Sequence, residues 1–267
     1  MIYFIVPALN EAANMPRLLQ SLRQWSEAHG ERFHLILVDD GSQDDTAGIV
    51  RRFPDLPSTI VSHGRNQGVH EAFRSGFRAW SQVPARAEDL VVTLEADNTS
   101  SVAILDQMVA SARQGADLVL ASCYAPGGEV VGTNLMRTTL SACANLILRW
   151  TPGMPRVYTF SSFYRVYRAR FLSAALRSYG DRFIEEEGFV CVVEMLLKFG
   201  LLNGRIREVP LRLDGSQRRG TSKMRVLRTI RGYLVFFLSV VVGRTAKPDA
   251  SICMEDSIVQ TEPSSGT

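Results

Sequence analysis

Residues 35–46 read LILVDDGSQDDT, a short apolar run followed directly by acidic and polar residues. An apolar run of this kind is typical of a strand that is buried on both faces of a parallel sheet. A second such run, Ile2–Val6, comes earlier in the chain and ends in Pro7-Ala8-Leu9-Asn10-Glu11. The two runs predict two core strands, each followed by polar residues at its carboxyl end.

The segment between these strands predicts a helix that begins near Asn14, a suitable N-cap, and ends at Gly30. Leu18, Leu22 and Trp25 recur within it at helical spacing. Farther along, strand and helix patterns alternate, which predicts an α/β fold with a mostly parallel sheet and helices on both faces. The other expected elements are helices at Val69–Trp80, Val102–Ala112, Asn134–Trp150 and Gly188–Lys198, strands at Leu90–Leu94, Leu118–Ala121 and Ile206–Leu213, an extended segment at Thr159–Tyr167, and one or two amphipathic helices within Lys223–Val242.

The composition is that of an ordinary globular enzyme. Of 267 residues, 46% are hydrophobic and 21% charged, and the net charge of +3 is too small to indicate nucleic acid as the main partner. The four cysteines are widely spaced, which indicates buried thiols in a reducing compartment and neither a disulfide framework nor a zinc site. Met1–Val6 lacks a preceding basic region, so we expect a core strand there and not a signal peptide. No stretch reaches the roughly 18 apolar residues needed to span a bilayer.

Glu95 and Asp97 follow the expected strand at Leu90–Leu94 and lie two residues apart. In an extended backbone both carboxylates point the same way. Such a pair at a strand end fits a hard divalent cation, Mg²⁺ or Mn²⁺, completed by diphosphate oxygens and water. The alternative is that one carboxylate caps the helix beginning near Ser100 while the other is solvated.

The segment Arg65-Asn66-Gln67-Gly68 precedes the helix expected at Val69–Trp80. A helix N-terminus with a nearby guanidinium is a suitable phosphate site. Equally, Gly68 turns the chain and Asn66 caps the helix. The residues alone leave both interpretations open.

Six segments occur in one order along the chain: PALNE, VDDGSQDDT, GRNQGVHEAFRSGF, LEADNTS, GADLVLASCYAPGG and RRGTSKM. Together they resemble glycosyltransferase family 2, and within it the polyprenyl (dolichyl) phosphate mannose synthases and their bacterial counterparts. The resemblance covers residues 2–235 and implies a GT-A fold and inversion at the anomeric carbon. We expect a GT-A domain at 1–215, a basic amphipathic helical segment at 216–244 and a disordered tail at 245–267.

The resemblance also implies roles for residues that match the family motifs. Asp97 would bind the metal as the second acid of the family's Asp-x-Asp, beside Glu95, and Ala96 would lie next to the donor diphosphate. Catalysis would rest on Asp97, Arg218 and Lys223. The residues implied to hold the nucleoside are Pro7, Leu9, Glu11, Val38 and Asp40, and those implied to approach the acceptor phosphate or the diphosphate are Arg137, Ser141, Arg218, Ser222 and Lys223.

Three positions depart from the pattern of these relatives. Glu95 replaces the first Asp of the metal motif, Thr99 stands where a metal-contacting Gln occurs, and Cys123 replaces an Arg. In the C-terminal motif the arginine is placed at Gln217 in some relatives and at Arg218 in others. We favour Arg218 here, with its neighbour Arg219 as a substitute. These departures bear on the identity of the donor and the acceptor.

The implied reaction is transfer of a mannose- or glucose-type sugar from a GDP- or UDP-sugar to a polyprenyl phosphate. A lipid phosphate is largely dianionic at neutral pH and needs cations rather than a general base. A hydroxyl acceptor would need a base, for which Glu186, Glu187 and Glu194 are the candidates unless they form a solvated helix N-terminus. A transferase acting on a saccharide or small-molecule hydroxyl is thus one alternative. A second alternative, suggested by Glu95 and Cys123, is a non-catalytic partner that binds a nucleotide sugar.

The segment from Arg218 to Arg231 carries six cations in fourteen residues and precedes the apolar run Tyr233–Val242. A helix of ten residues spans about 15 Å, half of a hydrocarbon core, so this run cannot cross a bilayer alone. An apolar strip flanked by cations can lie at an anionic membrane surface. We therefore expect a cytoplasmic protein, peripheral at the cytoplasmic face of the membrane. The alternative is that the run packs against the catalytic domain or a partner subunit.

Overall fold

The structure is a computed structural model that describes residues 1–132, 141, 144–220, 226–245 and 247–249. Three predicted site residues, Arg137, Ser222 and Lys223, lie outside these ranges. So do most of the helix expected at Asn134–Trp150 and nearly all of the tail expected at 245–267. Residues 144–148 of that expected helix are described, and they are helical.

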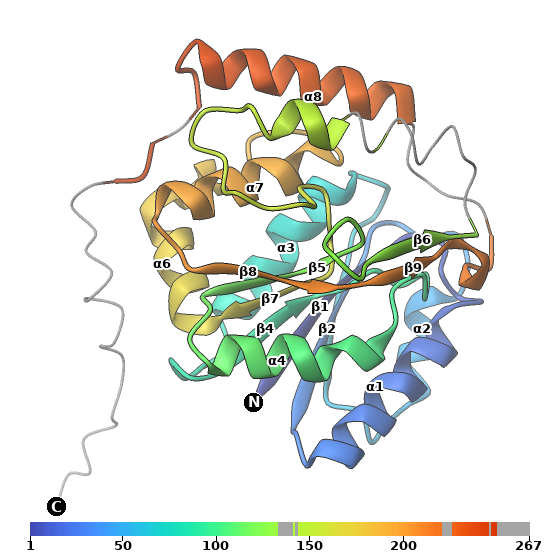
Figure 1. Cartoon of the computed structure of the whole chain (residues 1–267). Helices are drawn as coiled ribbons and strands as arrows, with labels where there is room; N and C mark the ends of the chain where they lie inside the picture. The colour runs from blue at the N-terminus through green and yellow to red at the C-terminus, as the bar shows by residue number, and fades with distance from the viewer. Residues whose placement is uncertain (133–140, 142–143, 221–225, 246, 250–267) are drawn as a thin grey trace, which may run out of the picture.

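A seven-stranded sheet runs through the centre of the molecule (Figure 1). Its strands are β1 Ile2–Ala8, β2 Phe33–Asp39, β3 Ser58–Ser62, β4 Leu90–Thr93, β5 Leu118–Ser122, β7 Arg165–Arg168 and β8 Ile206–Pro210. They lie in the order β3-β2-β1-β4-β7-β5-β8. The neighbours are parallel except where β7 pairs antiparallel with β4 and β5. The expectation of a mostly parallel sheet is confirmed.

A second, two-stranded sheet pairs β6 (Glu129–Val131) in parallel with β9 (Arg212–Asp214). The expectation of one strand at Ile206–Leu213 is therefore wrong, because the chain passes from β8 to β9 at Leu211. The Leu211 N–H donates to the carbonyl of Ser122, and its own carbonyl accepts from the Glu129 N–H. Through these two bonds Leu211 pairs with the large sheet on its N–H side and with the small sheet on its carbonyl side.

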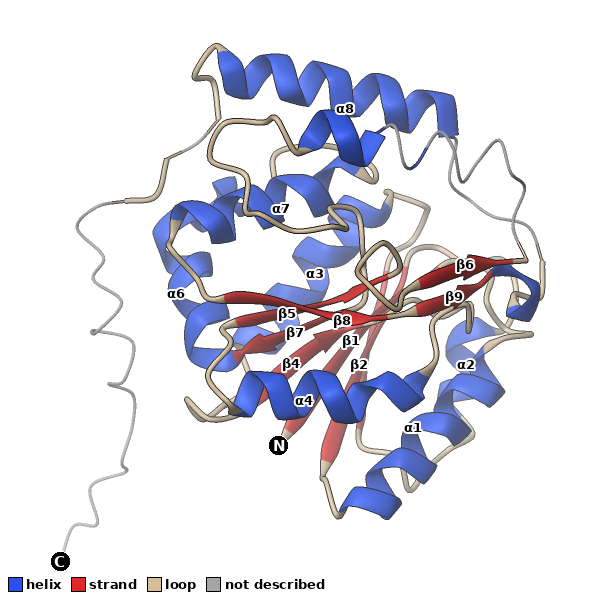
Figure 2. Cartoon of the chain, in the orientation of Figure 1, coloured by secondary structure: helices blue, strands red, loops and turns tan. Residues whose placement is uncertain are grey.

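Helices cover both faces of the large sheet (Figure 2). Alternation along β1 determines the two cores: Ile2 and Phe4 pack on one face, and Tyr3 and Ile5 pack on the other. Helices α1, α2 and α4 lie on the first face, α3, α6 and α7 lie on the second, and α8 packs on α7. Their bounds are α1 Met15–His29, α2 Thr46–Arg51, α3 Val69–Ser81, α4 Leu105–Arg113, α6 Ala169–Tyr179, α7 Val190–Leu201 and α8 Val226–Val241, with short 3₁₀ helices at Val102–Ile104, Gly180–Phe183 and Gly215–Gln217.

Glycines have specific roles at the end of α1 and in the packing of α3 on the sheet. Gly30 ends α1 in the left-handed conformation, with φ of 62°, as the sequence predicts. Gly76 lies in the middle of α3, where an added Cβ would come within 2.4 Å of a methyl carbon of Ile5. Glycine at this position therefore lets α3 lie directly on β1 and β2.

The helix α8 buries one side and exposes the other. Tyr233 and Phe236 are buried in the core that α7 shares. Leu234, Val235 and Leu238 are exposed, as are Val241 and Val242 at its end. Among the described residues, no helix combines the length and apolar character that crossing a membrane requires.

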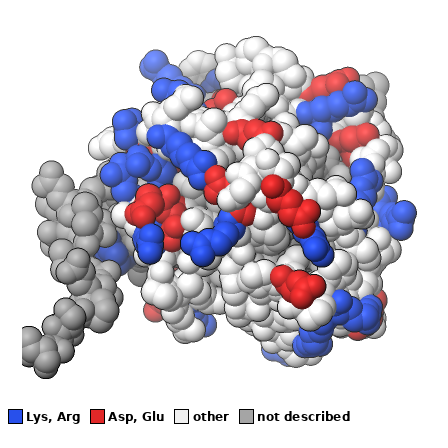
Figure 3. Space-filling model, turned by 90° about the horizontal axis from the view of Figure 1, so that it is seen from below, with Lys and Arg blue, Asp and Glu red and all other residues white. Residues whose placement is uncertain are grey.

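Charged side chains are spread over the opposite side of the molecule. Figure 3 views it from below the orientation of Figure 1, the side on which α1 and α4 lie. Basic and acidic side chains are interspersed there. This face therefore offers a mixed surface and not a field of one sign.

Candidate active site

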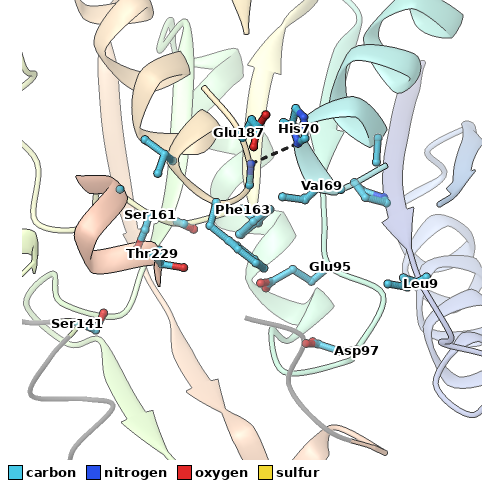
Figure 4. Close-up of a pocket in the computed structure, with 18 of the residues that line it drawn as sticks. Leu9, Val69, His70, Glu95, Asp97, Ser141, Ser161, Phe163, Glu187 and Thr229 are labelled. Atoms are coloured by element: carbon cyan, nitrogen blue, oxygen red, sulfur yellow. Dashed lines mark hydrogen bonds between the residues drawn. The ribbon is translucent and has the colours of Figure 1, made fainter. Parts of the chain in front are cut away.

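A cavity of about 1130 Å³ opens where β1, β2 and β4 reach their carboxyl ends. Ligands collect at this edge of open parallel sheets. The predicted donor residues that line it are Pro7, Leu9, Glu11, Asp40, Glu95, Ala96 and Asp97. Of the predicted acceptor residues that the structure describes, Ser141 and Arg218 line it too. In Figure 4, Leu9 lies on one side of the cavity and Ser141 and Thr229 on the other.

Val38 does not line the cavity, although its match to the family implied a nucleoside contact. Its side chain points from β2 toward Gly76 and is fully buried in the core. The next residue but one, Asp40, leaves the strand and reaches the cavity. Asp40 lies one residue beyond the end of β2, so the strand geometry that buries Val38 does not apply to it.

Asp40 is a buried carboxylate that holds the loop before α3. Its Oδ1 accepts from the Gln67 N–H (2.9 Å) and its Oδ2 from the Gly68 N–H (2.8 Å). His63 Nδ1 lies 2.7 Å from Oδ1, and Ser75 Oγ lies 2.9 Å from the other ring nitrogen of His63. The expectation that Gly68 turns the chain is confirmed, since it precedes α3 with φ of 94° and Asp40 holds this turn at the cavity edge. The expectation that Asn66 caps the helix is wrong, because Gly68 is the N-cap residue and no side chain caps α3.

Asp97 lies beyond the end of β4 in a turn, not in extended backbone. Asn98 adopts the left-handed conformation with φ of 61°, and Thr99 then donates its N–H (3.0 Å) and its hydroxyl (2.7 Å) to Asp97 Oδ1. The second oxygen, Oδ2, accepts from Arg218 Nε at 2.8 Å and from Nη2 of the same guanidinium. Thr99, at the position where the family resemblance implied a metal-contacting Gln, therefore orients the carboxylate.

Glu95 lines the same part of the cavity, and Ser100 Oγ lies 3.4 Å from its Oε2. Glu95 and Asp97 offer oxygen atoms of the kind that Mg²⁺ and Mn²⁺ prefer. The described residues contain no cluster of three or more acidic, histidine or cysteine side chains placed to hold a metal. Two carboxylates leave the remaining coordination positions to diphosphate oxygens and water, so the residues present fit the cation that the sequence predicts.

The charge of the cavity wall makes an anionic donor difficult to bind without cations. The acidic residues lining it are Glu11, Asp40, Glu95, Asp97, Glu185, Glu186 and Glu187, and the described arginines lining it are Arg218, Arg228 and Arg231. Among the described lining residues a nucleoside diphosphate would therefore meet more negative than positive groups, and in a partly buried site this repulsion is screened weakly.

Asn14 has a role that the sequence did not indicate. It occupies the N-cap position of α1, but its side chain makes no capping hydrogen bond. Instead its amide nitrogen donates to Glu11 (2.6 Å) and to the carbonyl of Arg219 (2.9 Å), and its amide oxygen accepts from the Arg219 N–H (2.9 Å). Asn14 thus joins the first strand end to a segment 205 residues away.

The acidic loop before α7 forms the wall opposite the metal ligands. His70 Nδ1 accepts from the Gly188 N–H at 3.2 Å (Figure 4). Burial, and then the neighbouring Glu194 carboxylate, raises the pKa of Glu186 above the ordinary value of a glutamic acid. Glu186 and Glu187 line the cavity, so both have the location that a base candidate needs.

Glu194 does not lie in the cavity, and its candidacy as a base is wrong. Its carboxylate is buried, accepts the N–H groups of Glu185 and Glu186, and pairs with Lys198 Nζ at 2.6 Å. Lys198 is fully buried. This ion pair anchors the loop that carries Glu186 and Glu187. The Glu-x-x-x-Lys spacing on α7 is the one sequence signal that could have indicated it.

Cys123, at the position where the family resemblance implied an arginine, lines the cavity. Burial raises the pKa of its thiol to about 11, so the side chain is neutral at physiological pH. A neutral thiol cannot replace the phosphate contact of an arginine. The described cations near the acceptor side come instead from the start of α8, at Arg228 and Arg231.

Comparisons with known proteins agree with this geometry. An undecaprenyl-phosphate mannosyltransferase from Micrococcus luteus is 32% identical over 209 residues, which cover 78% of this chain and 81% of that one. An undecaprenyl-phosphate 4-deoxy-4-formamido-L-arabinose transferase from Pseudomonas syringae is 35% identical over 118 residues. That match covers 43% of this chain and a third (33%) of the relative, so this chain corresponds to part of the longer transferases.

The fold is shared with solved structures. Glucosyl-3-phosphoglycerate synthase from Mycobacterium tuberculosis, crystallised with Mn²⁺, UDP and glucosyl-3-phosphoglycerate, superposes with a TM-score of 0.60 at 18% identity, over 94% of this chain and 81% of that one. The same enzyme has been crystallised with Mg²⁺ and UDP. The model of the family described as glycosyl transferase family 2 matches residues 3–176. The chain belongs to glycosyl transferase family 2 and has its GT-A type of fold.

Proposed function

We propose that this protein transfers a sugar, with inversion, from a nucleotide-sugar donor to a polyprenyl phosphate, and that the transfer depends on Mg²⁺ or Mn²⁺. The observation that carries the proposal is the meeting of Glu95, Asp97 and Arg218 at the carboxyl edge of the sheet. The relative matched over most of both chains is named for sugar transfer to undecaprenyl phosphate. The solved structures that share the fold hold a divalent metal and UDP.

One side of the cavity would bind the donor and the other side would bind the acceptor phosphate. Glu95 and Asp97 would hold the divalent cation, which neutralises charge on the diphosphate leaving group. Asp40 and the Gln67–Gly68 backbone would bound the nucleoside. Lys223, predicted to face the phosphates, follows the Arg218–Arg219 segment closely in the chain. An acceptor phosphate entering from the side of Arg228 and Arg231 would attack the anomeric carbon in line with the departing diphosphate.

A hydroxyl acceptor is the second candidate, and Glu186 is the observation that favours it. A half-buried carboxylate with a raised pKa at a cavity wall is a suitable general base. Such a base stops working as the pH falls through its pKa, because protonation removes the lone pair. Loss of activity would therefore begin at a higher pH than for an ordinary glutamate. A lipid phosphate would not depend on Glu186 in this way.

Acceptor screening is the experiment that decides between the two. We expect transfer to short polyprenyl phosphates, metal-dependent and reduced less than tenfold by Glu186→Gln. A requirement for Glu186, with transfer to saccharides and none to polyprenyl phosphate, would select the hydroxyl acceptor. If the protein hydrolyses the donor in a metal-dependent way but transfers sugar neither to polyprenyl phosphate nor to a saccharide, both acceptor assignments are wrong. Nucleotide-sugar binding with neither transfer nor hydrolysis would indicate a non-catalytic partner.

Asp40→Ala is expected to weaken binding of the donor nucleotide by about 1–3 kcal/mol, the usual effect of leaving buried polar partners unpaired. The loss would act through the Gln67 and Gly68 N–H groups and His63 as well as through any direct contact. Calorimetry with UDP and with GDP measures it. Asp45→Ala is the matched control, because this exposed acid pairs with Arg52 away from the cavity. Unchanged affinity for both nucleotides in Asp40→Ala would remove Asp40 from the donor site.

Membrane attachment through α8 is a further part of the proposal. The exposed side of α8 carries Leu234, Val235 and Leu238, and exposed arginines occur near both of its ends, at Arg231 and Arg244. Packing against the domain accounts for Tyr233 and Phe236 but not for this side, which a membrane or, in the remaining alternative, a partner subunit would cover. An apolar side flanked by cations suits an anionic membrane surface on which a lipid acceptor is found. This would place the protein at the cytoplasmic face of the membrane.

Vesicle flotation tests the attachment. We expect binding to anionic vesicles at low salt, and weaker binding at high salt because the cations are exposed. Replacing Leu234 and Leu238 together with Gln should reduce binding while keeping Tyr233 and Phe236 in the core. Leu201→Gln, an exposed apolar residue of α7, serves as the control. Equal flotation of the double variant and the wild type would exclude α8 as the contact.

A further inference from the structure

The predicted metal ligand Asp97 already holds a cation of the protein itself. Arg218 binds Asp97 Oδ2 through Nε at 2.8 Å and through Nη2. The side chains are 20% and 10% exposed, respectively, so water screens the pair weakly. Because Thr99 occupies Oδ1 with two hydrogen bonds, both oxygens of the carboxylate are engaged.

The segment that carries Arg218 is fixed independently of this ion pair. Asn14 binds both the N–H and the carbonyl of Arg219. On the other side, the Asp214 N–H donates to the carbonyl of Thr99 (2.9 Å), and Leu213 forms a bridge with Ser100. Backbone contacts on both sides hold the segment against the cavity. The Arg218 side chain can therefore leave Asp97 without the segment leaving the site.

We propose that Arg218 occupies the cation position of Asp97 while the site is empty, and that divalent metal binds by exchange with this guanidinium. The inference rests on the proposed role of Asp97 as a metal ligand. A metal ion and Arg218 compete for Oδ2, because two cations at contact distance from one oxygen repel each other in a partly buried site. Asp97 is neutralised by one cation or the other.

The exchange connects metal binding with anion binding. Once displaced, Arg218 stays tethered at the cavity wall, where a diphosphate or an acceptor phosphate can accept its hydrogen bonds. When metal binds alone, the displaced Arg218 loses its carboxylate and gains no other partner. When metal binds together with a nucleotide, the displaced Arg218 can pair with the diphosphate. By linkage, the nucleotide raises the affinity for metal, and the metal raises the affinity for nucleotide by the same factor.

The test measures Mn²⁺ binding to the full chain without nucleotide, by electron paramagnetic resonance of free Mn²⁺. Arg218→Met keeps the length of the side chain and removes its charge, and we expect it to bind Mn²⁺ about tenfold more tightly than the wild type. Arg218→Lys keeps the charge but loses the paired geometry, so its affinity should lie between the two. Arg219→Met is the matched control, because Arg219 is exposed and meets Asn14 through its backbone; it should match the wild type.

A second arm adds UDP or GDP. The difference between the wild type and Arg218→Met should shrink, because the displaced guanidinium of the wild type then gains an anionic partner. Equal Mn²⁺ affinity of wild type and a folded Arg218→Met protein without nucleotide would overturn the exchange, as would equal tightening by Arg219→Met. Unchanged Mn²⁺ binding in Asp97→Asn is a different result, since it would remove Asp97 as a metal ligand and with it part of the proposed function.

Discussion

Asp97→Ala should abolish sugar transfer, with a loss of at least about 10³-fold. A divalent metal that stabilises a departing diphosphate contributes several kcal/mol to the transition state, and each 1.36 kcal/mol corresponds to about tenfold in rate. The substitution also frees Arg218 and Thr99 from the carboxylate that they share. Turnover of a matched donor and acceptor over a range of Mn²⁺ and Mg²⁺ concentrations measures the effect.

Two controls separate loss of the metal from loss of structure. Glu95→Asp should be tolerated better, because it keeps the carboxylate and gives the Asp-x-Asp pattern that the family resemblance implied. Asp97→Asn keeps the shape and the acceptor oxygen for Thr99, so it should fold as the wild type does and still be inactive. Full activity of Asp97→Ala, or wild-type activity that a chelator does not reduce, would exclude the metal assignment.

Glu194→Ala is expected to destabilise the protein by about 3 kcal/mol, the lower part of the range for breaking a buried ion pair, because the buried Lys198 keeps only the more exposed Glu185 carboxylate at 3.2 Å. Lys198 would lose its closest carboxylate, at 2.6 Å, in a position where its side chain is fully buried. The N–H groups of Glu185 and Glu186 would lose their acceptor as well. Urea denaturation followed by circular dichroism gives the change in the free energy of unfolding.

The double variant Glu194→Leu/Lys198→Met is the informative comparison. Replacing both partners by apolar side chains of similar size should recover much of the stability, but not the hydrogen bonds that fix the acidic loop. Glu27→Ala breaks the Arg23–Glu27 pair on α1, which has the same spacing but is exposed, and should change stability far less. A Glu194→Ala protein as stable as Glu27→Ala would show that the buried pair does not hold the loop.

Long and strongly patterned elements could be predicted from the sequence. The apolar runs of β1 and β2 and the aromatic stripe of α3 are each long enough for their period to be recognised. The elements that were missed are short or weakly patterned: α2 has six residues, β6 has three, and β3 is partly exposed along its length. The helix α6 was also missed. Its buried positions include small alanines, which give little contrast with polar neighbours.

The sequence by itself determined the location of the site. Asp40, Glu95 and Asp97 come directly after apolar strands, and strands of a parallel sheet all end at one edge, so these carboxylates had to meet there. The order of the motifs along the chain also determined the family. Both conclusions depend on local pattern, which a single sequence contains.

Tertiary structure alone decided which partner each of these groups meets. Arg218 lies 121 residues from Asp97, and Asn14 lies 205 residues from the segment it holds. Glu194 looked like its acidic neighbours, yet it pairs with Lys198 inside the core. Packing of distant elements brings Arg218 to Asp97 and Asn14 to the Arg219 segment, whereas Lys198 lies four residues from Glu194 on α7 and burial is what distinguishes that pair. Sequence spacing cannot report the first two contacts, because their partners lie 121 and 205 residues apart, and for Glu194 and Lys198 it can suggest the pair but not its burial.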